Sequence, residues 1–334
     1  MAFLACAVAG GSVGRRSRER RAQRAWLVPL ALPLLQVVAR WVRDLPPRRA
    51  WQLASLLGLL FRWLRVTRAT VRRNLELACG GLPAGPALER FEADYYRHMA
   101  LLVVEFLRQP ALTRERLPEA LSDWSGLERA LSIYRRGEGA IFVAGHAGVW
   151  ELAGHIAGLA GVEILSVAKF SGHPDIDAFT SGIRESGGQQ VKDVRGSLWG
   201  MKKQLDRKQA VGINVDQEAR QGRVFAPFFG IPAATSNAPA LLHLRTGAPI
   251  VVVTALRRGP FRYSLEVLDE IRHPPGPDRD ADLVAITTRI NRAMEAALRE
   301  CPEQWLWSHR RWRRRPEDEQ VPFARVDETP PLAI

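Results

Sequence analysis

A histidine and a glutamate stand where an apolar run meets a predicted helix. His146 follows the apolar run 140–144, and Glu151 lies five positions later in Gly145-His146-Ala147-Gly148-Val149-Trp150-Glu151. Side chains at the ends of buried strands face the crevice in which α/β sheets bind their ligands. A histidine there can take a proton from a hydroxyl or amine, and a carboxylate in the next helical turn can fold back to hold its tautomer. The segment predicts His146 as a general base oriented by Glu151.

Other chemistries lack their signatures in this sequence. It contains no Gly-x-Ser-x-Gly elbow, no P-loop, no Gly-x-Gly-x-x-Gly after a strand and no metal-type histidine spacing. The three cysteines, Cys6, Cys79 and Cys301, are far apart and form no Cys-x-x-Cys or Cys/His cluster. We therefore expect no cofactor and no metal. A histidine at a strand end can also be purely structural, so the spacing by itself leaves that alternative open.

Alternating apolar and helical segments frame the pair. The expected strands are 140–144, 162–168, 210–215, 249–255 and 261–268. The expected helices are 126–136, 149–159, 175–186, 198–208, 236–246 and 281–300. Apolar strands alternating with helices predict an α/β fold with a mainly parallel central sheet flanked by helices. The Gly- and Pro-containing segment 217–235 is expected to be a long loop.

The basic charge is confined to the N-terminal quarter of the chain. Residues 1–73 hold 15 Lys/Arg and 2 Asp/Glu, which accounts for the whole net charge of +13, and residues 74–334 hold 33 of each. Arginines flank two apolar runs, 25–39 and 50–61, a pattern that fits a bilayer interface better than nucleic acid. A 15-residue helix rises ~22 Å, short of the ~30 Å hydrocarbon core. These runs are therefore expected to form an anchor embedded in the bilayer or lying at its interface, rather than a helix that spans it. The alternative is that they form a hairpin of buried helices in a soluble protein.

Ordered motifs along most of the chain resemble a known family. The box 146–151 is similar to the His-x4-Asp/Glu box of glycerolipid acyltransferases. The wider set resembles the late, lauroyl/myristoyl acyltransferases of lipid A biosynthesis, within the lysophospholipid acyltransferase superfamily, over roughly 26–315. The similar stretches are 72–78, 146–151, 216–217, 224–233, 246–249 and 302–312.

The resemblance implies a membrane-associated O-acyltransferase at the cytoplasmic face of a bacterial inner membrane. It implies transfer of a fatty acyl chain from an acyl thioester, usually on acyl carrier protein, to a hydroxyl of an anionic phosphoglycolipid such as a lipid A precursor. In that reaction His146 deprotonates the hydroxyl, Glu151 orients the histidine, and no covalent acyl-enzyme forms. The implied organisation is a basic tail (1–25), a helical membrane-anchor region (26–110), an α/β acyltransferase domain (111–315) and a C-terminal tail (316–334).

Further residues are predicted to contact substrates. Lys169 stands where the family usually has arginine, and Arg184 matches a later family arginine; both are expected to bind the acceptor phosphate. Asp216 and Gln217 end a buried strand beside the first site, where the alternative is a loop anchor. Arg223 is expected to contact phosphate or donor.

Departures from the family pattern leave the acceptor open. Val149 replaces a usual asparagine, so a glycosylated phospholipid remains an alternative acceptor. A different class, a non-catalytic basic protein binding membrane or nucleic acid, is disfavoured by the His146/Glu151 pair.

Overall fold

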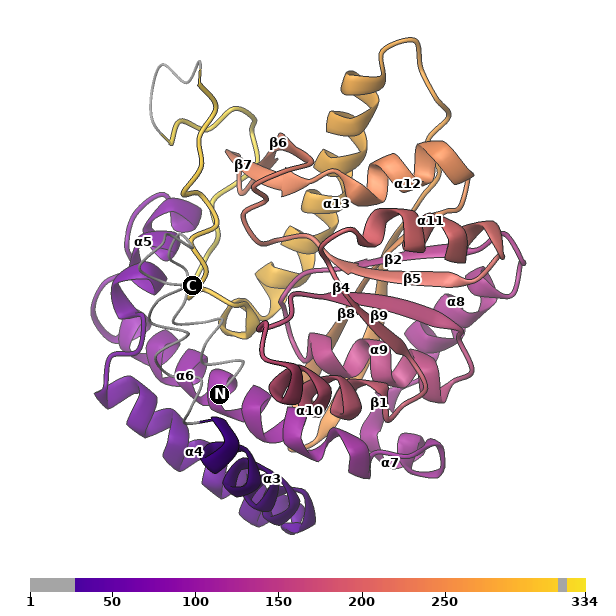
Figure 1. Ribbon diagram of the computed structural model, residues 1–334. Helices are drawn as coiled ribbons and strands as arrows, with labels where there is room; N and C mark the ends of the chain where they lie inside the picture. The colour runs from indigo at the N-terminus through magenta and orange to yellow at the C-terminus, as the bar shows by residue number, and fades with distance from the viewer. Residues whose placement is uncertain (1–27, 318–322) are drawn as a thin grey trace.

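Uninterrupted apolar runs form the middle of a seven-stranded sheet in the computed structural model, which describes residues 28–317 and 323–334 (Figure 1). The strand order is β1-β9-β8-β2-β5-β3-β4. The bounds are β1 Leu121–Asp123, β2 Ala140–Ala144, β3 Ile164–Ala168, β4 Gln190–Asp193, β5 Ala210–Asn214, β8 Ile250–Gly259 and β9 Arg262–Ile271. The basic tail expected over 1–25 lies outside the described residues.

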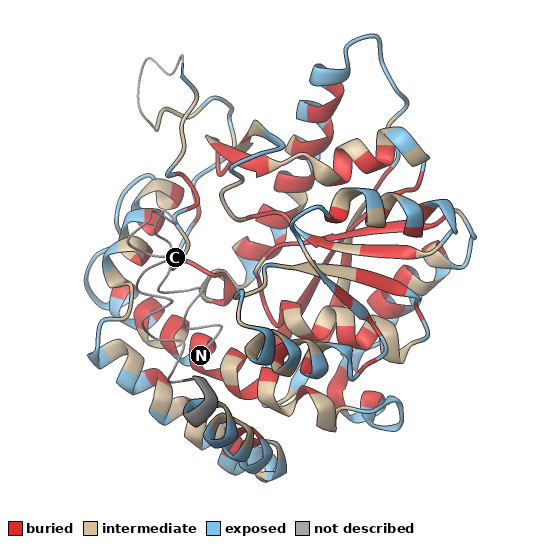
Figure 2. Ribbon diagram, in the orientation of Figure 1, coloured by how far each residue is buried: buried red, intermediate tan, exposed pale blue. Residues whose placement is uncertain are grey.

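The sheet is mainly parallel, which confirms the predicted fold class. Strands β8, β2, β5, β3 and β4 pair in parallel, and β9 runs antiparallel to β8. Every residue of β2 is buried, as expected for a strand covered on both faces (Figure 2). The short strands β1 and β4 were not predicted, because neither has a sustained apolar run.

Helices cover both faces of the sheet. Figure 1 shows α11, α12 and α13 on one side and α9 and α10 on the other. Their bounds, with α8, are α8 Ser125–Tyr134, α9 Trp150–Leu159, α10 Pro174–Glu185, α11 Ser197–Asp206, α12 Ala238–Thr246 and α13 Arg279–Glu300. These agree with the predicted helices to within a few residues.

The long loop predicted over 217–235 is wrong for most of its length. It contains an antiparallel hairpin, β6 Arg223–Phe228 and β7 Ile231–Ser236. Its turn residues, Phe229 and Gly230, both have positive φ, 49° and 74°, as two-residue hairpin turns of type I′ require. The hairpin packs on α13, where Asn291 donates to the Pro227 carbonyl at 2.9 Å. Glycine and proline mark this turn rather than an irregular loop.

The N-terminal helices α3 Val28–Asp44, α4 Pro47–Trp63, α5 Arg68–Cys79 and α6 Gly85–Arg108 form a layer beside the sheet. Short helical segments then connect to β1: η2 Gln109–Ala111, η3 Arg114–Arg116 and α7 Leu117–Ala120. Within the described part of the chain, none of the helices combines the length and apolarity needed to cross a bilayer.

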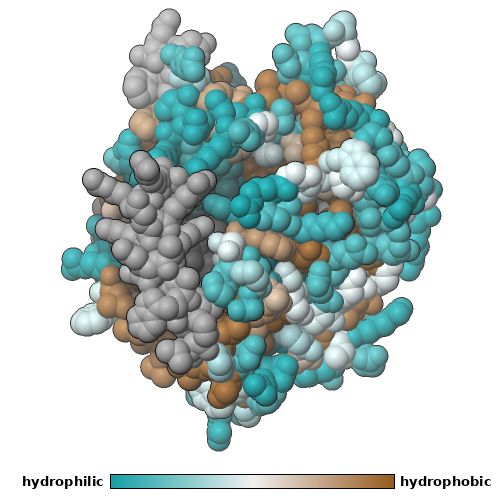
Figure 3. All heavy atoms as spheres, in the orientation of Figure 1, coloured by the Kyte–Doolittle hydropathy of each residue, from teal (hydrophilic) through white to brown (hydrophobic). Residues whose placement is uncertain are grey.

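The fully buried positions of α4 are small residues, and Trp51, Leu53 and Leu57 pack partly buried beside them. Ala50, Ala54 and Gly58 are buried, and a side chain at Gly58 would come within 2.7 Å of the α6 backbone. The opposite face carries exposed Leu56, Leu59, Leu60 and Trp63, and α3 adds exposed Leu34, Val37 and Trp41. Hydrophobic atoms gather over α3 and α4 at the lower left of Figure 3.

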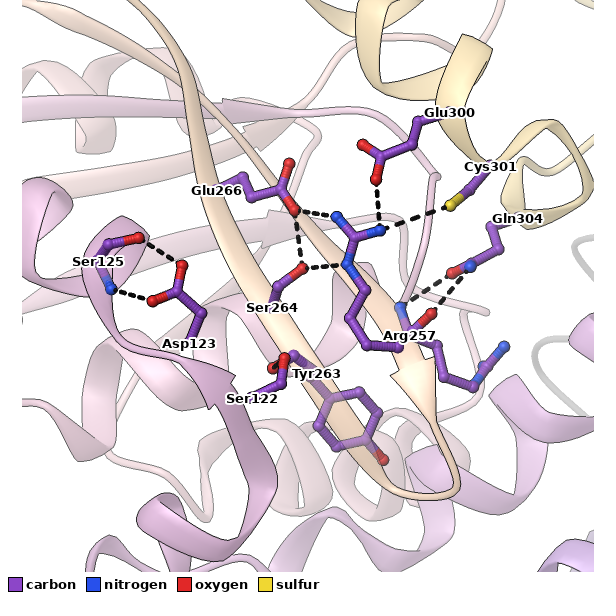
Figure 4. Close-up of polar contacts among 11 residues, drawn as sticks. Ser122, Asp123, Ser125, Arg257, Tyr263, Ser264, Glu266, Glu300, Cys301 and Gln304 are labelled. Carbon is purple, nitrogen blue, oxygen red and sulfur yellow. Dashed lines mark hydrogen bonds and ion pairs between the residues drawn. The ribbon is translucent and has the colours of Figure 1, made fainter.

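A buried ion pair fastens α6 to the sheet. The Arg257 guanidinium on β8 donates to both oxygens of Glu105, one bond being 2.8 Å from Nε, and their side chains are 6% and 2% exposed. Arg257 also donates to His98 Nδ1 at 2.6 Å. Burial and the Arg257 charge hold the pKa of His98 well below its usual range, so this ring is a neutral acceptor. A neighbouring arginine, Arg258, makes a similar but partly exposed pair with Glu266 (Figure 4).

Glu105→Gln is expected to lower the free energy of unfolding by about 3–5 kcal/mol, because it leaves the buried Arg257 charge without its partner. The matched control is Glu266→Gln, whose half-exposed pair is worth ~1 kcal/mol or less. Urea unfolding of the two variants measures both. Equal losses would contradict the assignment.

Candidate active site

The register of two parallel strands sets His146 beside Asp216. In the β2–β5 pairing Ala144 lies opposite Asn214, and the Val215 amide donates to the Ala144 carbonyl at 3.1 Å. Each strand ends two residues before its polar residue, β2 before His146 and β5 before Asp216. Because carboxyl ends of adjacent parallel strands open on the same edge, two positions 70 residues apart meet there.

The Asp216 carboxylate accepts three hydrogen bonds from His146 and Trp305. Its Oδ1 lies 2.6 Å from His146 Nδ1, and its Oδ2 accepts from the His146 amide at 2.7 Å. The Trp305 indole donates to the same Oδ2 at 2.6 Å. The Asp216 side chain is only 2% exposed. Burial alone would raise its pKa, but the His146 charge and these hydrogen bonds outweigh burial and hold the pKa of Asp216 below its ordinary range.

An ionised Asp216 fixes the tautomer of His146. A carboxylate only accepts, so Nδ1 carries the proton and Nε2 keeps its lone pair. The Nε2 atom faces the Gln217 side-chain amide at 3.2 Å, and the ring edge packs on Trp150 with centroids 5.1 Å apart. The imidazole is 18% exposed. This arrangement presents a basic nitrogen to a ligand that displaces the Gln217 amide.

The spacing predicted a bond from Glu151 to His146, but among the described residues the Glu151 carboxylate bonds Arg184 instead. Both of its oxygens accept from Arg184, at 2.8 Å and 2.7 Å, in a pair whose side chains are 16% and 17% exposed. The first turn of α9 thus carries Glu151 toward α10, and Asp216 takes the position on His146 Nδ1. Arg184 also lies over the Phe106 ring at 5.4 Å, which ties both helices to α6.

A glycine permits the tight junction between His146 and α9. Gly148 has φ +59°, and a Cβ there would lie 2.0 Å from the Ala255 carbonyl oxygen. Its amide donates to the Gln304 carbonyl at 2.8 Å. Any larger residue would push the junction off β8 and move His146 with it.

The segment after α13 supports the site from the other side. Gln304 in η4 (Pro302–Gln304) exchanges two hydrogen bonds with the Arg257 backbone, at 3.0 Å and 3.1 Å (Figure 4). The next two residues then reach the site: Trp305 bonds Asp216, and the Leu306 amide donates to the His146 carbonyl at 3.0 Å. Sequence reasoning noted this segment only as a family motif and gave Trp305 no role.

His309, three residues further on, lies at the same place. Its Nε2 accepts from the Glu218 amide at 2.8 Å, next to the Gln217 side chain that faces His146. Burial lowers the pKa of His309 to about 4; the Asp216 charge opposes this shift, and the positive charges of Arg311 and Lys169 add to it. In the sequence His309 stands within the similar stretch 302–312, and nothing local shows what its side chain touches.

The three cations predicted to bind phosphate, Lys169, Arg184 and Arg223, differ in their exposure and in their protein partners. Lys169 is exposed at the end of β3 and forms no ion pair within the described residues. Arg184 is engaged by Glu151. Arg223 lies at the exposed start of β6, where it donates to the Arg220 carbonyl, and no hydrogen bond among the described residues connects it to His146.

The interior beside the site is nearly filled. A cavity next to Asp216, Gly145 and Met294 measures ≈ 10 Å³, about enough for one water. This cavity beside Asp216 is therefore too small for an acyl chain in this conformation. Among the described residues, no group of three or more His, Cys, Asp and Glu side chains could hold a metal ion.

Comparisons with known proteins agree with the motif resemblance. Residues 15–314 match the family model described as bacterial lipid A biosynthesis acyltransferase. The lipid A biosynthesis palmitoleoyltransferase of Escherichia coli (strain K12) is 27% identical over 91% of this chain and 96% of its own. The lipid A biosynthesis lauroyltransferase of the same strain is 26% identical over 88% of this chain and 94% of its own. A lipid A biosynthesis acyltransferase of Haemophilus influenzae is 25% identical over 79% of this chain and 84% of its own. The resemblance predicted from the sequence is confirmed.

Proposed function

Because the chain belongs to the bacterial lipid A biosynthesis acyltransferase family, and is thus an O-acyltransferase, we propose that it transfers a fatty acyl chain from an acyl thioester to a hydroxyl of a phosphoglycolipid such as a lipid A precursor. The observation that carries the mechanism is His146, held on Asp216 with its Nε2 lone pair facing the Gln217 side-chain amide. The relatives are named for different acyl chains, so the chain length is left open.

The reaction proceeds by direct attack. The acceptor hydroxyl displaces the Gln217 amide and gives its proton to His146 Nε2, while its oxygen bonds to the thioester carbonyl carbon. The tetrahedral intermediate collapses, the carbon–sulfur bond breaks, and the thiolate takes the proton from His146. Asp216 stabilises the imidazolium formed between these two transfers.

The two carboxylates act at different distances from the chemistry. Asp216 contacts His146 directly and orients it. Glu151 acts as a positioning residue, because its pair with Arg184 fixes the first turn of α9, which begins four residues after His146. This revises the role expected for Glu151 from the spacing.

Lys169 is the favoured contact for the acceptor phosphate. It is exposed at the edge where His146 lies, and its charge acts on His309. Arg184 and Arg223 remain secondary candidates because each guanidinium already has a protein contact. A glycosylated phospholipid would offer Lys169 the same phosphate chemistry, so it stays the alternative acceptor.

His146→Ala is expected to lower kcat ~10²–10⁴-fold, the usual worth of a general base, measured by acyl transfer from thioester to lipid A precursor. The kcat of Asp216→Asn should fall nearly as far as that of His146→Ala, because an amide can leave His146 in the wrong tautomer. Glu151→Gln should lose less, since it keeps a polar group for Arg184. Undiminished turnover in His146→Ala would refute the mechanism. A lower kcat in Glu151→Gln than in Asp216→Asn would instead make Glu151 the residue that orients His146.

We propose that α3 and α4 lie in the membrane interface on the cytoplasmic face of the inner membrane. Their outward faces carry the exposed Leu, Val and Trp side chains described above, and arginines flank both helices. Apolar side chains rimmed by arginine suit the boundary between acyl chains and anionic headgroups.

Leu59→Glu/Trp63→Glu is expected to reduce binding to anionic phospholipid vesicles at least tenfold, since each exposed apolar side chain contributes ~1.5–3 kcal/mol when buried. Vesicle flotation measures the bound fraction. Trp124→Glu/Val284→Glu, two exposed apolar positions elsewhere, is the matched control and should bind as the wild type does. Equal binding by all three proteins would contradict the assignment.

An acidic carrier protein is the proposed donor partner. Residues 190–209 hold six Lys/Arg and two acidic residues, within a region, 74–334, that has no net charge. Exposed Lys192, Lys203 and Arg207 surround a hollow of ≈ 260 Å³ beside Trp199, which is 73% exposed. We call this surface the α11 patch.

The α11 patch is placed to receive a carrier from the cytoplasm. The hollow of the patch lies at the amino ends of β4 and β5, which Gln190 and Gln209 mark, and β4 runs from it to Asp193, which pairs with Ala168 just before Lys169. Figure 1 shows α11 on the opposite side of the molecule from α3 and α4. A carrier bound there would approach from the side away from the bilayer.

Lys203→Glu/Arg207→Glu is expected to raise KM about tenfold or more for an acyl-carrier-protein donor, because rim charges steer association. With an acyl-pantetheine donor, which has no carrier, kinetics should stay near wild type. Arg135→Glu/Arg279→Glu makes the same charge change at exposed positions elsewhere and serves as control. Unchanged carrier kinetics would exclude the patch, and loss of vesicle binding instead would make it a lipid contact.

A further inference from the structure

We propose that His309 is a second catalytic residue, whose Nδ1–H donates a hydrogen bond to the thioester carbonyl oxygen as negative charge develops on it. The inference rests on the acyl-transfer function proposed above and adds to it the group that stabilises the oxyanion. It depends on which nitrogen of His309 carries the proton, and on where that nitrogen lies.

Backbone geometry fixes the His309 tautomer. The Glu218 amide can only donate, and it points at His309 Nε2 over 2.8 Å. Nε2 must therefore be the acceptor, which leaves the single proton of the neutral ring on Nδ1. Within the described residues Nδ1 has no hydrogen-bond partner, and it is not among the buried polar atoms left unsatisfied. His309 thus offers a fixed, solvent-accessible N–H.

Two connections place the His309 residue, and with it the ring that carries this N–H, near His146. Gln217 and Glu218 are consecutive, and the first faces His146 Nε2 at 3.2 Å while the second bonds His309 Nε2. On the other side, the Leu306 amide bonds the His146 carbonyl, and the His309 amide bonds the Leu306 carbonyl at 3.1 Å. A hydroxyl that reaches His146 Nε2 therefore arrives beside the His309 ring.

The surroundings keep His309 neutral during turnover. Burial is the main cause of its lowered pKa, and Arg311, a fully buried guanidinium that bonds the Ala234 carbonyl and Thr235, adds a positive charge nearby. A neutral His309 keeps its single proton on Nδ1 at assay pH. It also does not compete with His146 for the negative charge of Asp216. Donors fixed in advance stabilise a developing oxyanion without reorganising.

The donated hydrogen bond fits the balanced reaction. When the acceptor oxygen bonds to the carbonyl carbon, the carbonyl π electrons move to oxygen, and His309 Nδ1–H bonds this oxyanion without transferring its proton. The charge returns to carbon as the carbon–sulfur bond breaks and the thiolate leaves. His146 alone moves a proton.

Two amide substitutions separate this role from a structural one. His309→Gln places an acceptor near the Nε2 position for the Glu218 amide and removes the Nδ1 donor, whereas His309→Asn keeps a donor near Nδ1 and removes the acceptor. With an acyl thioester and a lipid A precursor, His309→Gln is expected to lose ~10²–10³-fold in kcat with little change in KM, as for removal of an oxyanion donor. His309→Asn is expected to retain more activity than His309→Gln.

The opposite order, with His309→Gln active and His309→Asn inactive, would overturn the proposal and leave His309 as an anchor of the 216–218 segment. Long-range ¹H–¹⁵N correlation of ¹⁵N-histidine-labelled wild-type enzyme tests the tautomer without any substitution, and a proton on Nε2 would also overturn it. Failure of the proposed function is distinguishable, because wild-type enzyme would then transfer no acyl chain. If only the His309 variants behave as wild type does, the function stands and this inference falls.

Discussion

The site depends on one buried carboxylate that must be satisfied by hydrogen bonds. Asp216 is out of contact with water, and an ionised group there is tolerated only with strong partners. Its donors are His146 in the β2–α9 junction and Trp305 after α13, while the carboxylate itself follows β5. Stabilising this charge therefore draws three distant segments together, and the same contacts set the tautomer of His146. Stability and catalytic geometry rest on the same hydrogen bonds here.

The His-x4-Glu spacing has a different structural meaning from the one that local reasoning suggests. Helix α9 begins at Trp150, and Gly148 turns the chain so that Glu151 faces α10 and Arg184. A residue five positions away in sequence is thereby less closely coupled to His146 than Asp216, which is 70 positions away. The motif still identifies the right place in the fold, because its glycine, histidine and helix start together form the junction.

The exposed apolar side chains and the exposed cations lie on different parts of the surface. Helix α4 packs closely on α6 through Ala50, Ala54 and Gly58, and its Leu56, Leu59, Leu60 and Trp63 remain exposed. An amphipathic helix of a soluble core usually turns its large apolar residues inward, so this exposed apolar face is unusual. Cations gather on α11 at the far side of the sheet, although the chain beyond residue 73 has no net charge. The proposed lipid and carrier contacts thus lie on opposite sides of the molecule (Figure 1).

The sequence by itself determined the α/β class, the positions of most strands and helices and the family, and it singled out His146 as the candidate base. Apolar run length and helical periodicity are local properties, and ordered motifs survive where overall identity is low. Tertiary structure alone decided which carboxylate reaches His146, because the β2–β5 register is set by packing between strands distant in the chain. It also decided that 223–236 is a hairpin and that Trp305 and His309 enter the site. These outcomes depend on positive φ at two turn residues, and on contacts between segments that no local pattern specifies.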